Sequence, residues 1–218
     1  SNFVAAGIKP VFVFDGEPPR LKARTIERRG EVKIRAEREW KEAVEVGDLA
    51  TARTKAMQTS RLTAEMVDQS KRLLGLLGVP IVQAPSEGEA QASAMARSGS
   101  AYAAASQDYD ALLFGAPRLV KNLAISGRRK LPRKEVYVDV QPEEIGLDAT
   151  LAALALTREQ LVDMALLIGT DFNEGVRGIG PKKALSLIRK HGSLEPALVE
   201  LKMDIESKDE VRQIFLEP

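Results

Sequence analysis

The sequence predicts an α/β protein with a mostly parallel sheet flanked by helices, followed by a helical region. Two observations predict this fold class. Up to about residue 140, short apolar runs alternate with segments of helical periodicity, which is typical of parallel strands covered by helices. After Gln141-Pro142 only helical periodicity continues. We therefore expect two domains, residues 1–140 and residues 141–218.

Composition excludes several classes of protein. Lys and Arg number 32 against 31 Asp and Glu, so any nucleic acid must be met by local basic patches. Three such patches occur, at residues 20–42, 115–134 and 177–191, although each alone is compatible with a solvated face. The absence of cysteine excludes disulfides and thiolate metal sites. A single histidine argues against a Ser-His-Asp triad or a multi-histidine zinc site.

The first elements follow from short-range patterns. Residues 11–14 form an apolar run between Pro10 and Asp15, which predicts a buried strand. Residues 20–46 contain helix formers but few apolar residues, so we expect a long helix that projects from the body. An amphipathic helix over residues 63–77 is ended by a glycine and followed by a strand at residues 80–83.

The next segment continues the alternation. Ser86-Glu87-Gly88-Glu89 matches a capping box, which predicts a helix over residues 87–97. A third strand is expected at residues 101–105, and further strands at 118–123 and 135–140.

The helical region is predicted from one strongly apolar stretch and one tight turn. Residues 158–168 form the apolar helix, and residues 178–181 form the turn, with a proline suited to the first position of the next helix. That helix is expected over residues 182–190. Two shorter helices should follow, at 193–201 and 208–215.

Acidic residues follow each of the three clearest strands. Parallel strands share one carboxyl edge, where ligands bind in open sheets, so these side chains should converge. They are Asp15, Glu87, Glu89, Asp108 and Asp110. Carboxylates crowded together need compensation, and carboxylate donors suit Mg²⁺ or Mn²⁺. Two such ions roughly 3.5–4 Å apart can hydrolyse a phosphodiester.

Each acidic segment also has a structural explanation. Asp15-Gly16 alone is compatible with a turn, Glu89 with the capping box, and Asp108 with Asp110 with the end of a strand. When the three acidic segments are considered together at one edge of the sheet, the structural explanation requires three coincidences.

The turn at residues 178–181 has the pattern of a helix-hairpin-helix near residues 172–192. Its glycines allow close approach to a phosphate, the following helix presents N–H groups, and two lysines add positive charge. The candidate DNA-binding residues are Gly178, Gly180, Lys182 and Lys183. An ordinary helical packing element is the alternative. Lys22 and Arg29 are seven residues apart, hence on one helical face, and are suited to hold a phosphate.

Five segments together resemble the structure-specific 5′ nucleases, most closely the archaeal and eukaryotic flap endonucleases. They are Val13-Phe14-Asp15-Gly16-Glu17-Pro18-Pro19, Ala84-Pro85-Ser86-Glu87-Gly88-Glu89-Ala90, Ser106-Gln107-Asp108-Tyr109-Asp110, Gly169-Thr170-Asp171-Phe172 and Arg177-Gly178-Ile179-Gly180-Pro181-Lys182-Lys183-Ala184. The resemblance covers nearly the whole chain. It implies a PIN-like 5′ nuclease fold whose body, residues 1–140, carries a helical arch at residues 20–60.

The resemblance also implies site residues that the positions of the predicted strands do not indicate. Asp171 would be a sixth metal ligand. Lys22 and Arg29 would act on the scissile phosphate from the arch. Main-chain carbonyls of Gly175, Val176 and Ile179 would hold a monovalent cation, although glycine at 175 departs from the family's usual small polar residue.

The implied function is removal of 5′ flaps from branched DNA in replication and repair. The resemblance also implies two Mg²⁺ ions, which Mn²⁺ can replace. It implies a monomeric intracellular enzyme, in the cytoplasm or nucleoid of an archaeon or in the nucleus of a eukaryote, with a sliding clamp as partner. Against the family pattern, we expect this chain to lack the N-terminal strand and the C-terminal clamp-binding tail. A related 5′ exonuclease or repair endonuclease, and a catalytically inert DNA-binding module, stay open as alternatives.

Overall fold

The computed structural model describes residues 3, 6–59, 62–124, 127–130 and 136–217, without the side chains of residues 128–130. The chain divides into two compact units. Unit 1 contains Ser1–Phe14 and Pro18–Val82, and unit 2 contains Asp15–Glu17 and Gln83–Pro218. The predicted domain boundary near residue 140 stays a prediction. Within the described ranges, no helix combines the length and the apolar character needed to cross a membrane.

Unit 1 is mostly helical. Its elements are β1 (Phe12–Phe14), the 3-10 turn η1 (Arg20–Lys22), α2 (Ala23–Glu45), α3 (Leu49–Thr59), α4 (Ala64–Leu76) and β2 (Ile81–Gln83), whose last residue belongs to unit 2; β1 is paired to β2. The expected strands and the helices over 20–46 and 63–77 are confirmed, whereas α3, which lies within the expected helical arch at residues 20–60, was not predicted as a separate helix. Gly78 follows α4 with a φ of 68°, as a glycine after a helix end should.

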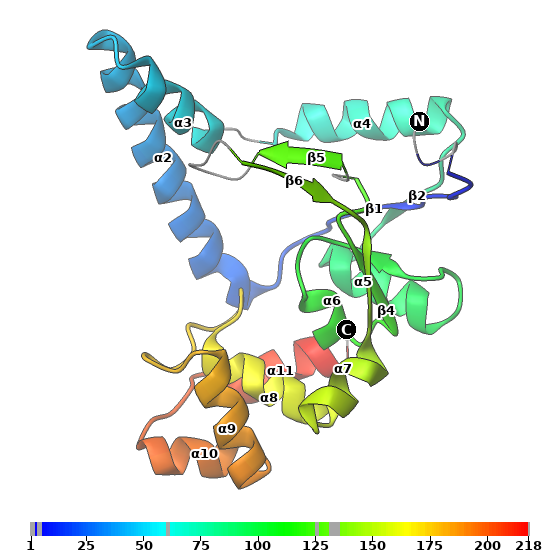
Figure 1. Ribbon diagram of the computed structural model, residues 1–218, viewed down its shortest axis with the longest axis vertical. Helices are drawn as coiled ribbons and strands as arrows, with labels where there is room; N and C mark the ends of the chain where they lie inside the picture. Colours follow the sequence, from blue (N-terminus) through cyan, green and yellow to red (C-terminus); the bar gives the residue numbers. More distant parts are fainter. Residues whose placement is uncertain (1–2, 4–5, 60–61, 125–126, 131–135, 218) are drawn as a thin grey trace. The chain divides into compact units, whose positions relative to one another are not determined.

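The long helix α2 lies beside α3 as a helical hairpin (Figure 1). Small side chains form the seam, with Ala36, Ala43 and Ala52 buried. Glu39 of α2 forms an ion pair with Lys55 of α3. The hydrogen bond from Lys55 is the main reason that the pKa of Glu39 lies below its ordinary value.

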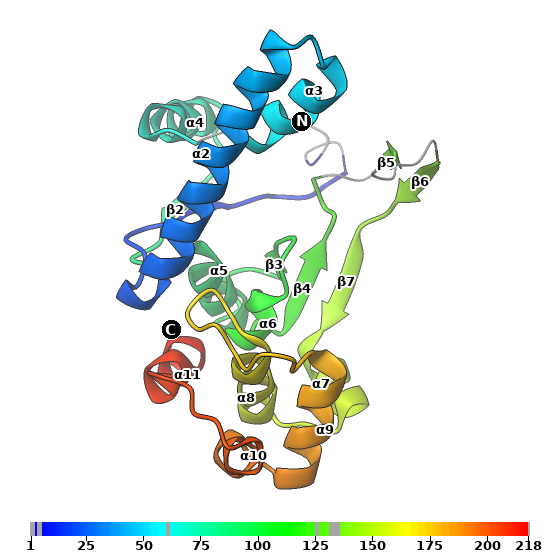
Figure 2. The ribbon, with the colours of Figure 1, turned by 90° about the vertical axis from the view of Figure 1, so that its left-hand side faces the viewer.

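Unit 2 contains a three-stranded sheet in the order β3 (Ala104–Ala105), β4 (Arg118–Lys121) and β7 (Glu143–Gly146) (Figure 2). β3 and β4 are parallel, and β4 and β7 are antiparallel. The expectation of helices alone after residue 142 is wrong, because β7 is a strand. Opposite charges explain the pairing: Lys121 faces Glu143 in the register, and Arg118 forms an ion pair with Glu144 at 3.7 Å.

A separate antiparallel pair joins β5 (Gly127–Lys130) to β6 (Tyr137–Val140). The strands expected at 118–123 and 135–140 are therefore present as β4 and β6, although residue 135 lies outside the described residues. The described strands are only two to four residues long and form three short sheets in place of one larger sheet.

The helices of unit 2 follow the predicted order closely. They are α5 (Gly88–Arg97), α6 (Asp110–Leu113), α7 (Leu147–Leu154), α8 (Arg158–Ile168), α9 (Pro181–His191), α10 (Leu194–Leu201) and α11 (Lys208–Leu216). All five predicted helices are confirmed, and Pro181 occupies the first position of α9 as expected. The short α6 and α7 were not predicted.

The core of unit 2 includes three aromatic rings. Phe215 of α11 lies 4.9 Å, centroid to centroid, from Phe114 and 5.3 Å from Phe172. Phe114 ends α6 and Phe172 lies in the loop after α8, so the rings join three segments that are distant in sequence.

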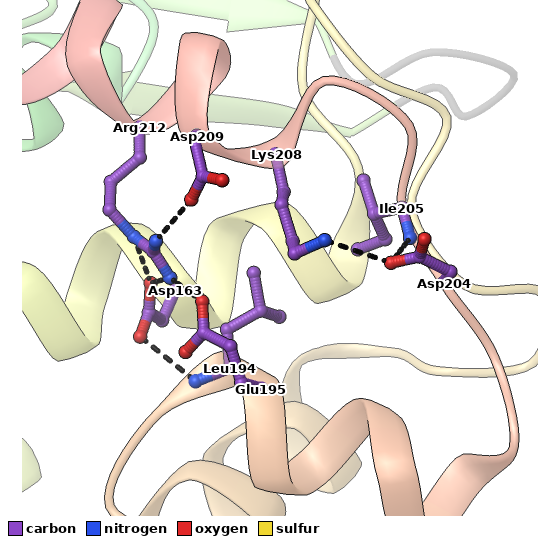
Figure 3. Close-up of polar contacts among 8 residues, drawn as sticks. All are labelled: Asp163, Leu194, Glu195, Asp204, Ile205, Lys208, Asp209 and Arg212. Carbon is purple, nitrogen blue, oxygen red and sulfur yellow. Dashed lines mark hydrogen bonds and ion pairs between the residues drawn. The ribbon is translucent and has the colours of Figure 1, made fainter.

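A buried carboxylate links three helices of unit 2 (Figure 3). Asp163 of α8 is 4% exposed; its carboxylate accepts the N–H of Leu194 at 3.0 Å and a hydrogen bond from Arg212 Nε at 2.9 Å. Arg212 also pairs with Glu195 and Asp209. Burial raises the pKa of Asp163, although Arg212 acts in the opposite direction. The contacts fix α10 and α11 on α8.

Candidate metal and nucleic-acid site

The loop after β1 is attached to the start of α5. Asp15 Oδ1 accepts the backbone N–H of Gly88, the first residue of α5, at 2.7 Å. The first N–H groups of a helix have no partner within it, and a negative charge there is favourable. Asp15 therefore caps a helix that begins 73 residues further along the chain.

Close packing makes this attachment specific to glycine. A Cβ on Gly88 would lie 2.8 Å from Asp15 Oδ1, and one on Gly16 would lie 2.2 Å from the carbonyl oxygen of Ala84. Gly16 N–H donates to the Ser86 carbonyl at 2.6 Å, and Gln83 Nε2 donates to the Asp15 carbonyl at 2.8 Å. Residues 15–17 are thus held on the segment that leads into α5.

The predicted capping box is wrong. The residue that caps α5 is Glu87, and no side chain of the box supplies a capping hydrogen bond. The carboxylate of Glu89 instead accepts a hydrogen bond from the Ser106 hydroxyl, beyond β3. The same hydroxyl accepts the N–H of Asp108 at 3.1 Å. Glu89 therefore contacts the segment after β3 that carries Asp108. This contact with a distant segment replaces the capping contact expected within its own helix.

Two arginines hold the turn that carries Asp110. Asp110 begins α6, and the carbonyls at the other end of this helix accept hydrogen bonds from side chains. Arg97 of α5 donates to Phe114 O at 2.8 Å, and Arg158 of α8 donates to Leu113 O at 3.2 Å. Arg158 also donates to Phe215 O at 2.6 Å. Burial, followed by the nearby charge of Arg97, lowers the pKa of Arg158.

A buried hydroxyl adds a second connection between α5 and α6. Ser93 is fully buried, and its hydroxyl lies 2.6 Å from the carbonyl of Glu89 and 3.2 Å from that of Ala111. Sequence reasoning assigned no role to Ser93, Ser106 or Arg158, because each acts through contacts that leave no local sequence pattern.

All six predicted acidic ligands belong to unit 2, and each is exposed or half-buried. The hydrogen bonds place Asp15 at the start of α5 and connect Glu89 of α5 with Asp108. Glu87 precedes α5, and Asp171 lies in the loop between α8 and α9. In the part of the chain that the structure describes, no group of three or more such side chains is close enough to hold a metal ion. A joint metal site stays a prediction.

The loop between α8 and α9 depends on one glycine. Gly175 has a φ of 67°, and a Cβ there would lie 2.4 Å from the backbone nitrogen of Gly169. The neighbouring Val176 N–H donates to Leu167 O at 2.9 Å, and Ile179 N–H donates to Val176 O at 3.0 Å. Any other residue at 175 would disturb this loop, which explains the departure from a small polar side chain.

The start of α9 faces solvent. Gly180 caps the helix without a side-chain hydrogen bond. Gly178, Gly180, Lys182 and Lys183 are all exposed. Lys183 Nζ donates to the carbonyl of Gly178 at 3.2 Å, so one lysine bridges the turn. Helix N–H groups and two ammonium groups are thus presented together.

The two predicted phosphate-binding residues belong to unit 1. Lys22 ends η1 and is half-buried, and Arg29 is exposed on α2. Their action on a phosphate held by the acids of unit 2 stays a prediction.

Comparison with known proteins identifies the family to which the chain is similar. Residues 1–36 match the XPG N-terminal domain, and residues 78–171 match the XPG I-region. Flap endonuclease 1 of Ignicoccus hospitalis is 58% identical over 203 residues, 93% of this chain and 58% of that protein. The Archaeoglobus fulgidus enzyme of the same name is 53% identical over 218 residues, 100% of this chain and 65% of that protein.

Solved structures agree. Flap endonuclease-1 from Methanococcus jannaschii aligns with a TM-score of 0.70 and 44% identity, covering 100% of this chain and 64% of that chain. The catalytic core of Rad2 in complex with DNA substrate aligns with a TM-score of 0.69 and 24% identity, and the alignment covers 99% of this chain and 67% of that chain. This similarity is a likeness of fold.

The predicted α/β class is therefore confirmed as a PIN-like 5′ nuclease fold. The chain belongs to the flap endonuclease family of structure-specific 5′ nucleases. It spans 58% and 65% of the length of the two curated relatives named above.

Proposed function

We propose that this chain carries the catalytic region of a structure-specific endonuclease that removes 5′ flaps from branched DNA in replication and repair. The observation that carries the proposal is a set of hydrogen bonds: Asp15 accepts the N–H of Gly88 at the start of α5, and the Ser106 hydroxyl donates to Glu89 and accepts the N–H of Asp108. These contacts organise acids from three segments within unit 2. The relatives named flap endonuclease 1 support the same activity.

The donor types fit a hard divalent cation, because all six side chains are carboxylates and each is exposed or half-buried. We assign two Mg²⁺ ions, replaceable by Mn²⁺, to Asp15, Glu87, Glu89, Asp108, Asp110 and Asp171. Such ions, when bound, activate water and offset charge on the phosphate. Asp15 keeps Oδ2 for this role, since Oδ1 accepts the Gly88 N–H. Arg97 and Arg158 orient the segment that carries Asp110.

The remaining residues bind DNA in this proposal. Lys22 and Arg29 neutralise the scissile phosphate. Gly178, Gly180, Lys182 and Lys183 contact the duplex backbone at the start of α9, where N–H groups favour an anion. Main-chain carbonyls of Gly175, Val176 and Ile179 hold a monovalent cation. The protein acts as a monomer on chromosomal DNA and cooperates with a sliding clamp.

The test is cleavage of a labelled double-flap DNA with and without Mg²⁺. We expect Mg²⁺-dependent release of the flap. Asp110→Asn should abolish cleavage while duplex affinity changes less than about twofold, and Asp148→Asn, an exposed acid on α7, should cleave like the unmodified chain. Equal loss of duplex binding and cleavage in Asp110→Asn would refute the separation of metal and duplex sites.

An inert DNA-binding module is the second candidate, and one observation favours it: no three acids are grouped within the described residues. Titration with Mn²⁺ separates the two. Saturable binding that Asp110→Asn weakens supports the nuclease, whereas duplex binding with no metal binding supports the module. A related exonuclease or repair endonuclease would be recognised by its products from the same flap substrate.

A further inference from the structure

An aromatic side chain lies exposed among the proposed metal ligands. Tyr109 separates Asp108 from Asp110 and caps the start of α6. It is 57% exposed, whereas Phe114 at the other end of α6 is 2% exposed. The tyrosine ring therefore contributes little to the core, although burying an aromatic ring is strongly favourable.

A lysine holds this ring in place. Lys121 Nζ lies 3.4 Å from the centroid of the Tyr109 ring, a cation–π contact. Lys121 is the last residue of β4, and Ser106 N–H donates to the carbonyl of the preceding residue, Val120, at 3.2 Å. The parallel pairing of β3 and β4 thus brings the lysine beside the segment that carries Tyr109.

The pair combines a flat π surface with a positive charge next to carboxylates. Aromatic rings bind unpaired bases by stacking without regard to sequence, because every base has a π face. The Lys121 ammonium covers one face of the ring, so a base would stack on the opposite face. The ring is oriented in advance by Lys121, so less conformational entropy is lost on binding.

We propose that Tyr109, supported by Lys121, is a stacking site for an unpaired nucleobase of the DNA beside the scissile phosphate. This site rests on the proposed nuclease function and adds a positioning residue to it. Stacking of one base would fix the position of the backbone relative to the carboxylates. The ring makes no contact that depends on base identity, so the site predicts positioning without sequence preference.

A matched control lies at the other end of β4. Tyr102 is 67% exposed, and Arg118, the first residue of β4, lies 4.6 Å from its ring centroid. Its hydroxyl donates to Glu144 at 3.1 Å, and Glu144 also pairs with Arg118. This second tyrosine and cation pair is therefore completed by the protein's own carboxylate and lies apart from the sequence 108–110.

The experiment measures binding of a 5′-flap DNA in Ca²⁺, with a gel verifying that the DNA stays uncut. The substrates carry either normal bases or an abasic site at one of the first three unpaired nucleotides. Tyr109→Leu should weaken binding of the normal flap about 5- to 140-fold, the effect of losing one stacked base. Tyr109→Phe should keep the affinity, since the ring is retained, and Tyr102→Leu should bind like the unmodified chain.

The abasic substrates decide the mechanism. At one position, removal of the base should weaken binding by the unmodified chain and leave binding by Tyr109→Leu unchanged, so that the two effects are not additive. Lys121→Met should reduce the same base-dependent affinity by a smaller factor.

Two results would overturn the stacking site. One is normal-flap affinity in Tyr109→Leu equal to that of the unmodified chain. The other is a loss of the same size on every abasic substrate. If the unmodified chain cleaves flaps in Mg²⁺, either result removes this site alone; if it neither binds nor cleaves flaps, the proposed function fails as well.

Discussion

Two helical hairpins of this chain are packed by different kinds of side chain. The α2–α3 hairpin buries only alanines at its seam and leaves Ile34 of α2 61% exposed. The α8–α9 hairpin fully buries Leu166 and Ile188, together with Val162, Leu167 and Ala184. The same supersecondary motif thus has a narrow seam of small side chains in one case and forms part of a hydrophobic core in the other.

Their polar contacts differ in the same way. Glu39 and Lys55, which join α2 to α3, are each about one third exposed as side chains. Asp163 of α8 is buried and fully engaged by Arg212 and the Leu194 N–H. In the proposed function, a turn that binds duplex DNA at a fixed position needs the second kind of packing, whereas an arch that engages a flexible strand tolerates the first. Four measurements test this difference, in order of decreasing effect.

The largest difference is expected between two glycines. Gly175→Ala in the α8–α9 loop should destabilise unit 2 by about 2–6 kcal/mol, because it adds a strained φ and a backbone clash. Gly30→Ala in α2 meets open space and should stabilise by about 0.5–1 kcal/mol. Chemical denaturation measures both. Effects of the same sign would refute the contrast.

The second difference is expected between two isoleucines, whose effects on the free energy of unfolding should differ nearly as much. Ile188→Ala removes a fully buried side chain from α9 and should lower the free energy of unfolding by about 2–5 kcal/mol. Ile34→Ala on α2 should change it by less than about 0.5 kcal/mol. A comparable loss from Ile34→Ala would mean that α2 is packed far more firmly than its exposure indicates.

The third measurement concerns DNA. Lys182→Ala with Lys183→Ala should weaken binding to all duplex sequences alike and reduce the salt slope by about two units, one for each phosphate that a lysine no longer neutralises. Lys202→Gln, an exposed lysine after α10, is the control and should leave the slope unchanged. A sequence-selective loss would contradict binding to the DNA backbone.

The smallest effect is a pH dependence of opposite sign in the two hairpins. The Lys55 hydrogen bond lowers the pKa of Glu39, so its stabilisation is present above the unfolded pKa and is lost as pH falls through the lower folded value. Burial raises the pKa of Asp163, so protonation in the folded state adds stability as pH falls.

Hydrogen exchange between pH 6 and 3 should therefore show α2–α3 losing protection before α8–α9, after correction for the intrinsic exchange rate. Glu39→Gln should reduce the acid dependence of α2–α3 without affecting α8–α9; the remainder comes from Asp48, whose pKa is lowered by its hydrogen bond with Thr51 of α3. Unchanged acid dependence in this variant would show that the ion pair between Glu39 and Lys55 has no thermodynamic role.

Local signals identified most helices correctly because their determinants lie within a few residues. Pro181 at the first position of α9 and the apolar periodicity of α8 are examples. β7 was not predicted because its glutamates have poor strand propensity, and only the basic strand opposite them makes pairing favourable. A single sheet was expected for the same reason: periodicity predicts strands but does not say which strands pair.

The sequence by itself determined which acids are available and that all of them except Asp171 follow a strand or lie at the start of a helix. Only the tertiary structure decided what those side chains contact. Glu89 bonds to Ser106 in place of capping its own helix, and Asp15 caps α5 from a distant segment. A capping box involves residues three positions apart, whereas these contacts depend on chain segments brought together by the packed core, whose geometry no local window of sequence contains.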